Sequence, residues 1–136
     1  MIQRPEYLNT LIGFKDKDLI KVVTGIRRCG KSTLFDLYCD YLIENGIEDN
    51  QIIKINLEEN EYENLHDYKI LYEYIKNRLQ ENKMNYIFID EVQKCKDFEK
   101  AVDSLYVKKN TDVYITGSNA YMLSRRTCNI IITEDI

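Results

Sequence analysis

The sequence predicts an α/β fold in which a parallel sheet is covered by helices on both faces. Short apolar segments rich in β-branched residues recur along the chain, and helical spacing of apolar residues follows them. A strand that is followed by a helix and another strand returns in the same direction through a right-handed crossover. The chain has 136 residues, which suits one compact domain with its own core.

The first strand and helix flank a glycine-containing loop. Residues 19–24 are apolar or β-branched and stop at Gly25, so we expect a buried strand that enters a turn. A helix is expected from Ser32 to about Gly46, a residue that suits a left-handed helix stop. The apolar face of this helix comprises Leu34, Leu37, Tyr38, Tyr41 and Leu42.

Three further strands are expected downstream. Residues 52–56 form the second, followed by a solvated acidic loop and by a helix with Leu71, Ile75 and Leu79 on one face. Residues 86–89 form the third, after which Asp97 is placed to cap a helix with buried residues Phe98, Ala101, Val102 and Leu105. Residues 113–116 form the fourth. Ligands of parallel sheets bind at the carboxyl ends of the strands.

Composition and charge exclude several classes of protein. The chain is 44% hydrophobic, contains no apolar run of about eighteen residues and starts without a secretory signal, so we predict a cytoplasmic protein with no membrane span. A net charge of −4 gives no support for nucleic-acid binding. Residues 1–35 nevertheless carry seven Lys or Arg against three acids, so an anionic ligand is expected near them. The four cysteines lack paired spacing, and no structural zinc site is expected.

The loop after the first strand matches the phosphate-binding pattern G-x-x-x-x-G-K-[ST] over residues 25–32. In this pattern, backbone N–H groups surround phosphate oxygens at a helix N-terminus. We expect Lys31 to reach the β- and γ-phosphates of a nucleoside triphosphate, and the Ser32 hydroxyl to bind magnesium. The predicted nucleotide-binding residues here are Gly25, Ile26, Arg27, Arg28, Cys29, Gly30, Lys31, Ser32 and Thr33.

Asp90 and Glu91 close the third strand with two carboxylates. One can hold magnesium through water, and the next can polarise the attacking water. Buried strands often end in an acidic turn, so this pair by itself is weak evidence for a catalytic site. The phosphate loop is the observation that favours the functional interpretation. A separate strand, 52–56, intervenes in sequence, as it does in the P-loop class with an additional central strand and a catalytic glutamate. The fold predicted is therefore a three-layer α-β-α P-loop NTPase sheet of that type.

Polar residues also follow the fourth strand, in the segment 116–119. Ser118 and Asn119 are the candidates to contact nucleotide and report its phosphate state, and an ordinary Gly/Ser/Asn turn is an equally weighted alternative. Arg27 and Arg28 either add positive potential or are simply exposed, and Cys29 is a tolerated small side chain beside the phosphates. The single histidine, His66, is predicted to face solvent.

With these motifs in place, the chain resembles archaeal and bacterial AAA-domain proteins whose phosphate loop reads GxRRxGKS. Such proteins also carry an apolar strand that ends in Asp-Glu and an Ile-Thr-Gly-Ser segment, matched here by 89–91 and 115–118. The resemblance covers 4–124. It implies an AAA+-type ATPase core that uses ATP and Mg²⁺, with Lys31 on phosphate, Ser32 and Asp90 on magnesium, and Glu91 as the water-activating base.

The segment 125–136 departs from this resemblance, so we divide the chain into a core, 1–124, and an atypical tail. Relatives usually continue with Gly-Glu-Leu-Ala-Thr and a separate C-terminal domain, whereas Arg-Arg-Thr-Cys-Asn stands at 125–129. A one-base shift of codons for the first string encodes the second, and we hypothesise a frameshifted chain whose C-terminal part is missing. AAA+ sites are usually completed by a helical lid and a neighbour's arginine. Neither is identified in this sequence, so slow hydrolysis is expected.

Three functions are compatible with the motifs. The first is an Mg-dependent ATPase core with Lys31 and Glu91 as the catalytic residues. The second is a nucleotide-binding module or remnant with little or no hydrolysis, and the third is a small-molecule P-loop kinase, for which no acceptor pocket or mobile lid is identified. The predicted partners are ATP and an unknown protein, with homo-oligomers expected of full-length relatives.

Overall fold

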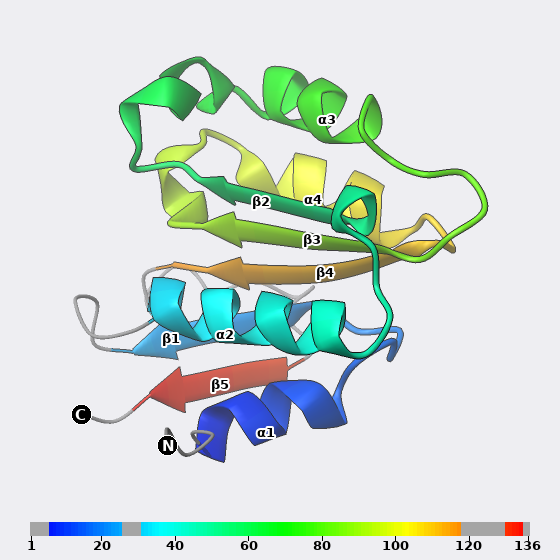
Figure 1. Cartoon of the computed structure of the whole chain (residues 1–136). Coiled ribbons are helices and arrows are strands. Elements are labelled where there is room, and N and C mark those ends of the chain that lie inside the picture. Colours follow the sequence, from blue (N-terminus) through cyan, green and yellow to red (C-terminus); the bar gives the residue numbers. More distant parts are fainter. Residues whose placement is uncertain (1–5, 26–30, 118–129, 135–136) are drawn as a thin grey trace.

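Five parallel strands form one sheet in the order β2-β3-β4-β1-β5 (Figure 1). The computed structural model describes residues 6–25, 31–117 and 130–134. Its strands are β1 (Lys21–Gly25), β2 (Ile52–Asn56), β3 (Asn85–Asp90), β4 (Thr111–Thr116) and β5 (Ile130–Glu134). Because β4 lies between β1 and β3, the glycine-loop strand and the Asp90 strand are not neighbours. The predicted additional central strand is thereby confirmed.

Helices cover both faces of the sheet (Figure 1). They are α1 (Glu6–Gly13), α2 (Lys31–Glu44), α3 (Tyr68–Lys76) and α4 (Phe98–Tyr106), with short 3-10 helices η2 (Asp49–Gln51), η3 (Asn60–Leu65) and η4 (Val92–Lys94). Buried residues of α1 and α2 pack on one face, and those of α3 and α4 pack on the other. The three-layer α-β-α architecture predicted from the sequence is therefore confirmed.

β3 shows how side-chain alternation builds the two cores. Tyr86 and Phe88 point into the core with α1 and α2, whereas Ile87 and Ile89 point into the core with α3 and α4. All six residues of β3 are buried, as expected for a strand inside a sheet covered on both faces. This burial pattern fixes the strand's register, since a slip by one residue would exchange the two faces.

The four predicted strands are present, with ends that shift by at most two residues. Among the described α-helices and strands, α1 and β5 were not predicted, and neither were the short 3-10 helices. β5 pairs with β1 from Lys21↔Ile130 to Gly25↔Glu134 and comes from the segment assigned to the tail. Its residues Ile130, Ile131 and Ile132 are β-branched, which suits a strand. The division of the chain at 124 stays a prediction.

Helix ends agree with the sequence except at α3 and α4. α3 ends at Lys76, so Leu79, which was predicted to lie on its apolar face, follows the helix and packs on the same core from the loop. Gly46, after α2, has the expected positive φ of 97°. Asp97 precedes α4 but makes no side-chain cap hydrogen bond, so the predicted cap is wrong. Its φ of 59° is left-handed, whereas a capping side chain normally projects from extended backbone. Asp67, which is extended, instead caps α3 by accepting from the backbone N–H of Lys69 at 2.8 Å.

A buried ion pair joins the amino ends of β1 and β4. Lys21 Nζ donates to Asp112 Oδ1 at 2.5 Å, and the side chains are 0% and 1% exposed. Asp112 Oδ2 accepts from the Tyr114 hydroxyl and from the backbone N–H of Asp16, both at 2.8 Å. Three donors therefore hold this carboxylate, and one of them, the N–H of Asp16, attaches the loop after α1 to the sheet.

Candidate functional site

The glycine loop connects a central strand to a helix. β1 ends at Gly25 and α2 begins at Lys31, with Ser32 and Thr33 in its first turn. The rest of the loop, Ile26, Arg27, Arg28, Cys29 and Gly30, lies outside the described residues, as do Ser118 and Asn119. The described flanks form the strand and helix that the phosphate-binding pattern requires, whose helix N-terminus favours an anion.

Asp90 and Glu91 lie at the carboxyl end of β3, the same edge at which β1 enters the loop. Asp90 is 5% exposed, and its carbonyl oxygen accepts from the backbone N–H of Leu57 at 3.1 Å. Glu91 is half-buried and left-handed, with φ 55° and ψ 51°. A non-glycine residue in this region costs about 1–2 kcal/mol, so surrounding contacts must hold it there.

Thr116 supplies one of these contacts from the neighbouring strand. Its Oγ1 accepts from the backbone N–H of Glu91 at 2.9 Å and donates to Asp90 Oδ1 at 2.7 Å. One hydroxyl thus fixes the turn at Glu91 and orients the Asp90 carboxylate. Thr116 is 0% exposed and is the last residue of β4. The sequence singled out its segment for contact with nucleotide, but not this bridge between the two carboxylate residues.

Gln93 holds the side chain of Glu91. Its Nε2 donates to Glu91 Oε1 at 2.8 Å from within η4, the single turn that follows β3. Gln93 was not among the residues predicted from the sequence, although a glutamine two positions after a candidate base is a usable signal. Glu91 is therefore held at its backbone by Thr116 and at its carboxylate by Gln93.

Lys54 on β2 brings positive charge toward this region. It pairs with Asp36 of α2, and its partly exposed side chain lies two residues before Asn56, the register partner of Asp90. Burial by itself lowers the pKa of Lys54, but its hydrogen bond to Asp36 and the charges of Asp36 and Asp90 raise that pKa above its ordinary value. The lysine therefore keeps its charge at neutral pH.

The donors at this edge suit magnesium. Mg²⁺ prefers oxygen ligands and is usually bound through one or two carboxylates together with substrate phosphates. Asp90 supplies a carboxylate whose orientation is set by Thr116. A carboxylate has about four acceptor sites, so the bond from Thr116 is compatible with binding a metal or a metal-bound water.

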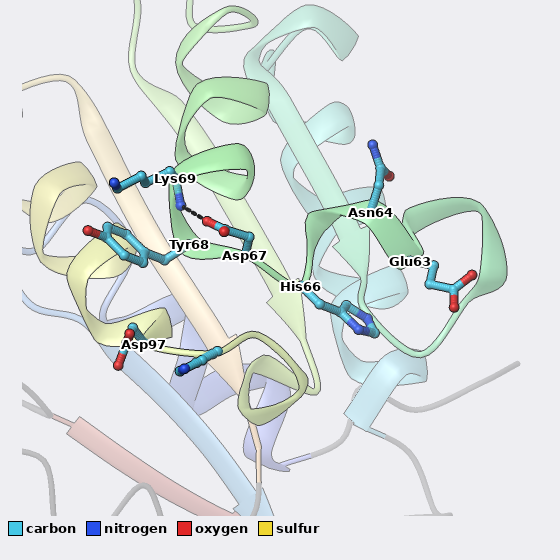
Figure 2. Close-up of a pocket in the computed structure, with 8 residues that line it drawn as sticks. Glu63, Asn64, His66, Asp67, Tyr68, Lys69 and Asp97 are labelled. Atoms are coloured by element: carbon cyan, nitrogen blue, oxygen red, sulfur yellow. Dashed lines mark hydrogen bonds between the residues drawn. The ribbon is translucent and has the colours of Figure 1, made fainter.

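A cavity of about 510 Å³ lies elsewhere, around the starts of α3 and α4 (Figure 2). In Figure 2, Glu63 and Asn64 come from η3 on one side, and Tyr68 and Lys69 come from α3 on the other. His66 Nε2 lies 2.8 Å from the carbonyl oxygen of Leu57, and its own carbonyl accepts from the N–H of Lys96. His66 is half-buried and lines this cavity, so the prediction that it faces solvent holds only in part: its ring and its backbone also connect the loop to Leu57 and Lys96.

A protein of Haemophilus influenzae, itself uncharacterized, is 41% identical over 132 residues. The match covers 96% of this chain but only 33% of the relative, so the chain spans about a third of that protein's length. The fold is that of a P-loop NTPase-like α/β domain. A family model described as AAA domain matches residues 17–130, and the chain belongs to this family.

The described part of the chain contains no helix with the length and apolar character needed to span a bilayer.

Proposed function

We propose that this chain binds ATP with Mg²⁺ through the loop between β1 and α2 and hydrolyses it to ADP and phosphate. The observation that carries the proposal is the pair Asp90 and Glu91 at the sheet edge where the glycine loop begins, with Thr116 bonded to the carboxylate of the first and the backbone N–H of the second. Membership in the AAA domain family supports the use of ATP.

Each residue has a distinct part in the proposed reaction. The backbone N–H groups of 26–32 bind phosphate oxygens, and Lys31 neutralises charge on the β- and γ-phosphates. Ser32 and Asp90 would hold Mg²⁺, which, when bound, supplies positive charge to the phosphate oxygens. Glu91 accepts a proton from water as the water oxygen bonds to the γ-phosphorus and the bond to the ADP oxygen breaks.

The test compares Lys31→Ala with Glu91→Gln. Because Lys31 is proposed to contact the phosphates, Lys31→Ala should weaken ATP binding strongly. Glu91→Gln should bind ATP with nearly wild-type affinity and lose turnover by about 100-fold or more, because only the base is removed. Binding is measured by calorimetry with and without Mg²⁺, and turnover by single-turnover phosphate release.

The results separate hydrolysis from binding alone. A wild-type chain that binds MgATP without turnover would identify a nucleotide-dependent binding module. Phosphate transfer to a supplied small molecule, in preference to water, would identify a kinase. Equal binding by wild type and Lys31→Ala would contradict the proposed site itself.

The broader setting is also a proposal, since this chain spans only a third of its Haemophilus relative. We propose that it acts in the cytoplasm, that its ATP cycle serves a protein partner, and that longer relatives form homo-oligomers.

A further inference from the structure

Two glutamines, the buried Gln51 and the half-buried Gln93, contrast in their hydrogen bonding. Gln51 is 7% exposed and paired at both ends of its amide: Oε1 accepts from the N–H of Glu48 at 3.0 Å, and Nε2 donates to the carbonyl of Met84 at 2.9 Å. Gln93 is paired at one end only. Its Nε2 donates to Glu91, whereas its Oε1 is buried and has no partner among the described residues.

An unpaired buried acceptor lowers stability, because it loses its hydrogen bonds to water and gains none in return. Methionine has a similar length and shape and would not leave such an atom. A glutamine that served only packing at this position would therefore be a poor choice. The one favourable polar contact described for Gln93 is its charge-assisted bond to Glu91.

We infer that Gln93 is a positioning residue that holds the Glu91 carboxylate where it can take a proton from the water that attacks the γ-phosphate, an inference that rests on the proposed function. A glutamate side chain rotates about three bonds, and Glu91 is only half-buried. The bond from Gln93 Nε2 to Oε1 restricts these rotations, while Thr116 fixes the backbone at the same residue. Together they place the base reproducibly, at the expense of one unpaired carbonyl in Gln93.

The test is the same substitution at both glutamines, Gln93→Met and Gln51→Met, in the full chain. For Gln93→Met we expect kcat for ATP hydrolysis to fall about 10- to 100-fold with KM and MgATP affinity unchanged, because a misplaced base slows chemistry without affecting binding. Its Tm should equal or exceed that of wild type, since the unpaired acceptor is removed.

Gln51→Met should show the opposite behaviour. Its amide is satisfied at both ends and lies away from Asp90 and Glu91, so its Tm should fall by about 3 °C or more while kcat stays within twofold of wild type. The glutamines would then be separated into one that serves turnover and one that serves stability.

Two results would overturn the inference: kcat of Gln93→Met within twofold of wild type, or a fall in its kcat accompanied by a Tm loss like that of Gln51→Met. Either leaves the ATPase proposal intact, provided that the wild type turns over and Glu91→Gln does not. If the wild type itself binds MgATP but shows no single-turnover hydrolysis, the ATPase proposal fails, and the role of Gln93 fails with it.

Discussion

The two ends of the sheet use the same kinds of residue to different effect. At the amino end, the Asp112 carboxylate accepts from Lys21, Tyr114 and the Asp16 backbone, and is 1% exposed. At the carboxyl end, Asp90 is held by Thr116 next to a second acid, Glu91. The first arrangement neutralises its carboxylate within the protein. At the second, two acids that are consecutive in the chain end β3 at the edge where the glycine loop begins, which suits binding a cation.

This contrast has a cost at the carboxyl end. Glu91 is in a left-handed conformation, and no group among the described residues pairs with the buried side-chain carbonyl of Gln93. Among the described residues, the Lys21–Asp112 pair leaves no buried side-chain N or O atom unpaired, although Asp16, whose backbone donates to Asp112, also has a positive φ, of 64°. The difference indicates that the amino end contributes stability and that the carboxyl end is arranged for binding and chemistry.

The largest effect is expected for Asp112→Asn. The substitution keeps the shape of the side chain but leaves Lys21, which is 0% exposed, without its counter-charge. Removing one partner of a buried pair typically lowers the free energy of unfolding by about 3–5 kcal/mol. Urea denaturation measures the loss, and a change below about 1 kcal/mol would contradict the role assigned to this pair. Binding of MgATP by the folded fraction should be unchanged.

The matched substitution at the other end, Asp90→Asn, should have a smaller effect on stability and a specific effect on metal. Asparagine can still accept from Thr116, and repulsion with Glu91 is removed, so we expect the free energy of unfolding to change by about 1 kcal/mol or less. The Mg²⁺-dependent gain in ATP affinity should fall about 10- to 100-fold. Calorimetry with Mg²⁺ and with a chelator measures it, and an unchanged gain would exclude Asp90 as the metal ligand.

The smallest effect is expected from pH at the amino end. Partial burial by itself raises the pKa of Asp16, but hydrogen bonds from Lys15 and Tyr86 and the charges of Lys15 and Lys21 outweigh it and lower that pKa. The stabilisation is therefore complete above the ordinary aspartate pKa of about 3.9 and is lost as the pH falls through the lowered value.

Asp16→Asn tests this dependence, since asparagine tolerates the positive φ of 64° at this position. Urea midpoints at pH 7 and pH 3 should differ less for this variant than for wild type, because the titration of Asp16 is removed. Some difference should remain in the variant, since other carboxylates titrate in both proteins. An equal difference in the two proteins would show that Asp16 contributes nothing to acid sensitivity.

Local patterns predicted most of the fold. The four strands, the helix after the glycine loop and the stop at Gly46 follow from periodicity and residue type over a few neighbouring residues. β5 was not predicted, because its segment departs from the family resemblance and was assigned to an atypical tail. Its three isoleucines nevertheless suit a strand. The Asp97 cap was wrong because residue type does not report the backbone conformation at which a capping side chain must project.

Some features of the candidate site were also predictable from the sequence, and others were not. Asp90 and Glu91 were found because they end an apolar strand, a feature legible in six consecutive residues. The bridge from Thr116 could not be predicted from a short run of residues. Thr116 and Asp90 are 26 positions apart and meet only through the pairing of β3 with β4. The bond from Gln93 depends on the single turn of η4, whose side-chain directions the sequence does not specify.

The sequence by itself determined the types and order of the elements and the chemistry available at the strand ends, because spacing and side-chain type act locally. Only the tertiary structure decided that β4 lies between β1 and β3, so that a threonine joins the two acids and a lysine and an aspartate meet at the opposite edge. These contacts depend on strand order and register, which arise when distant segments bury their apolar faces together.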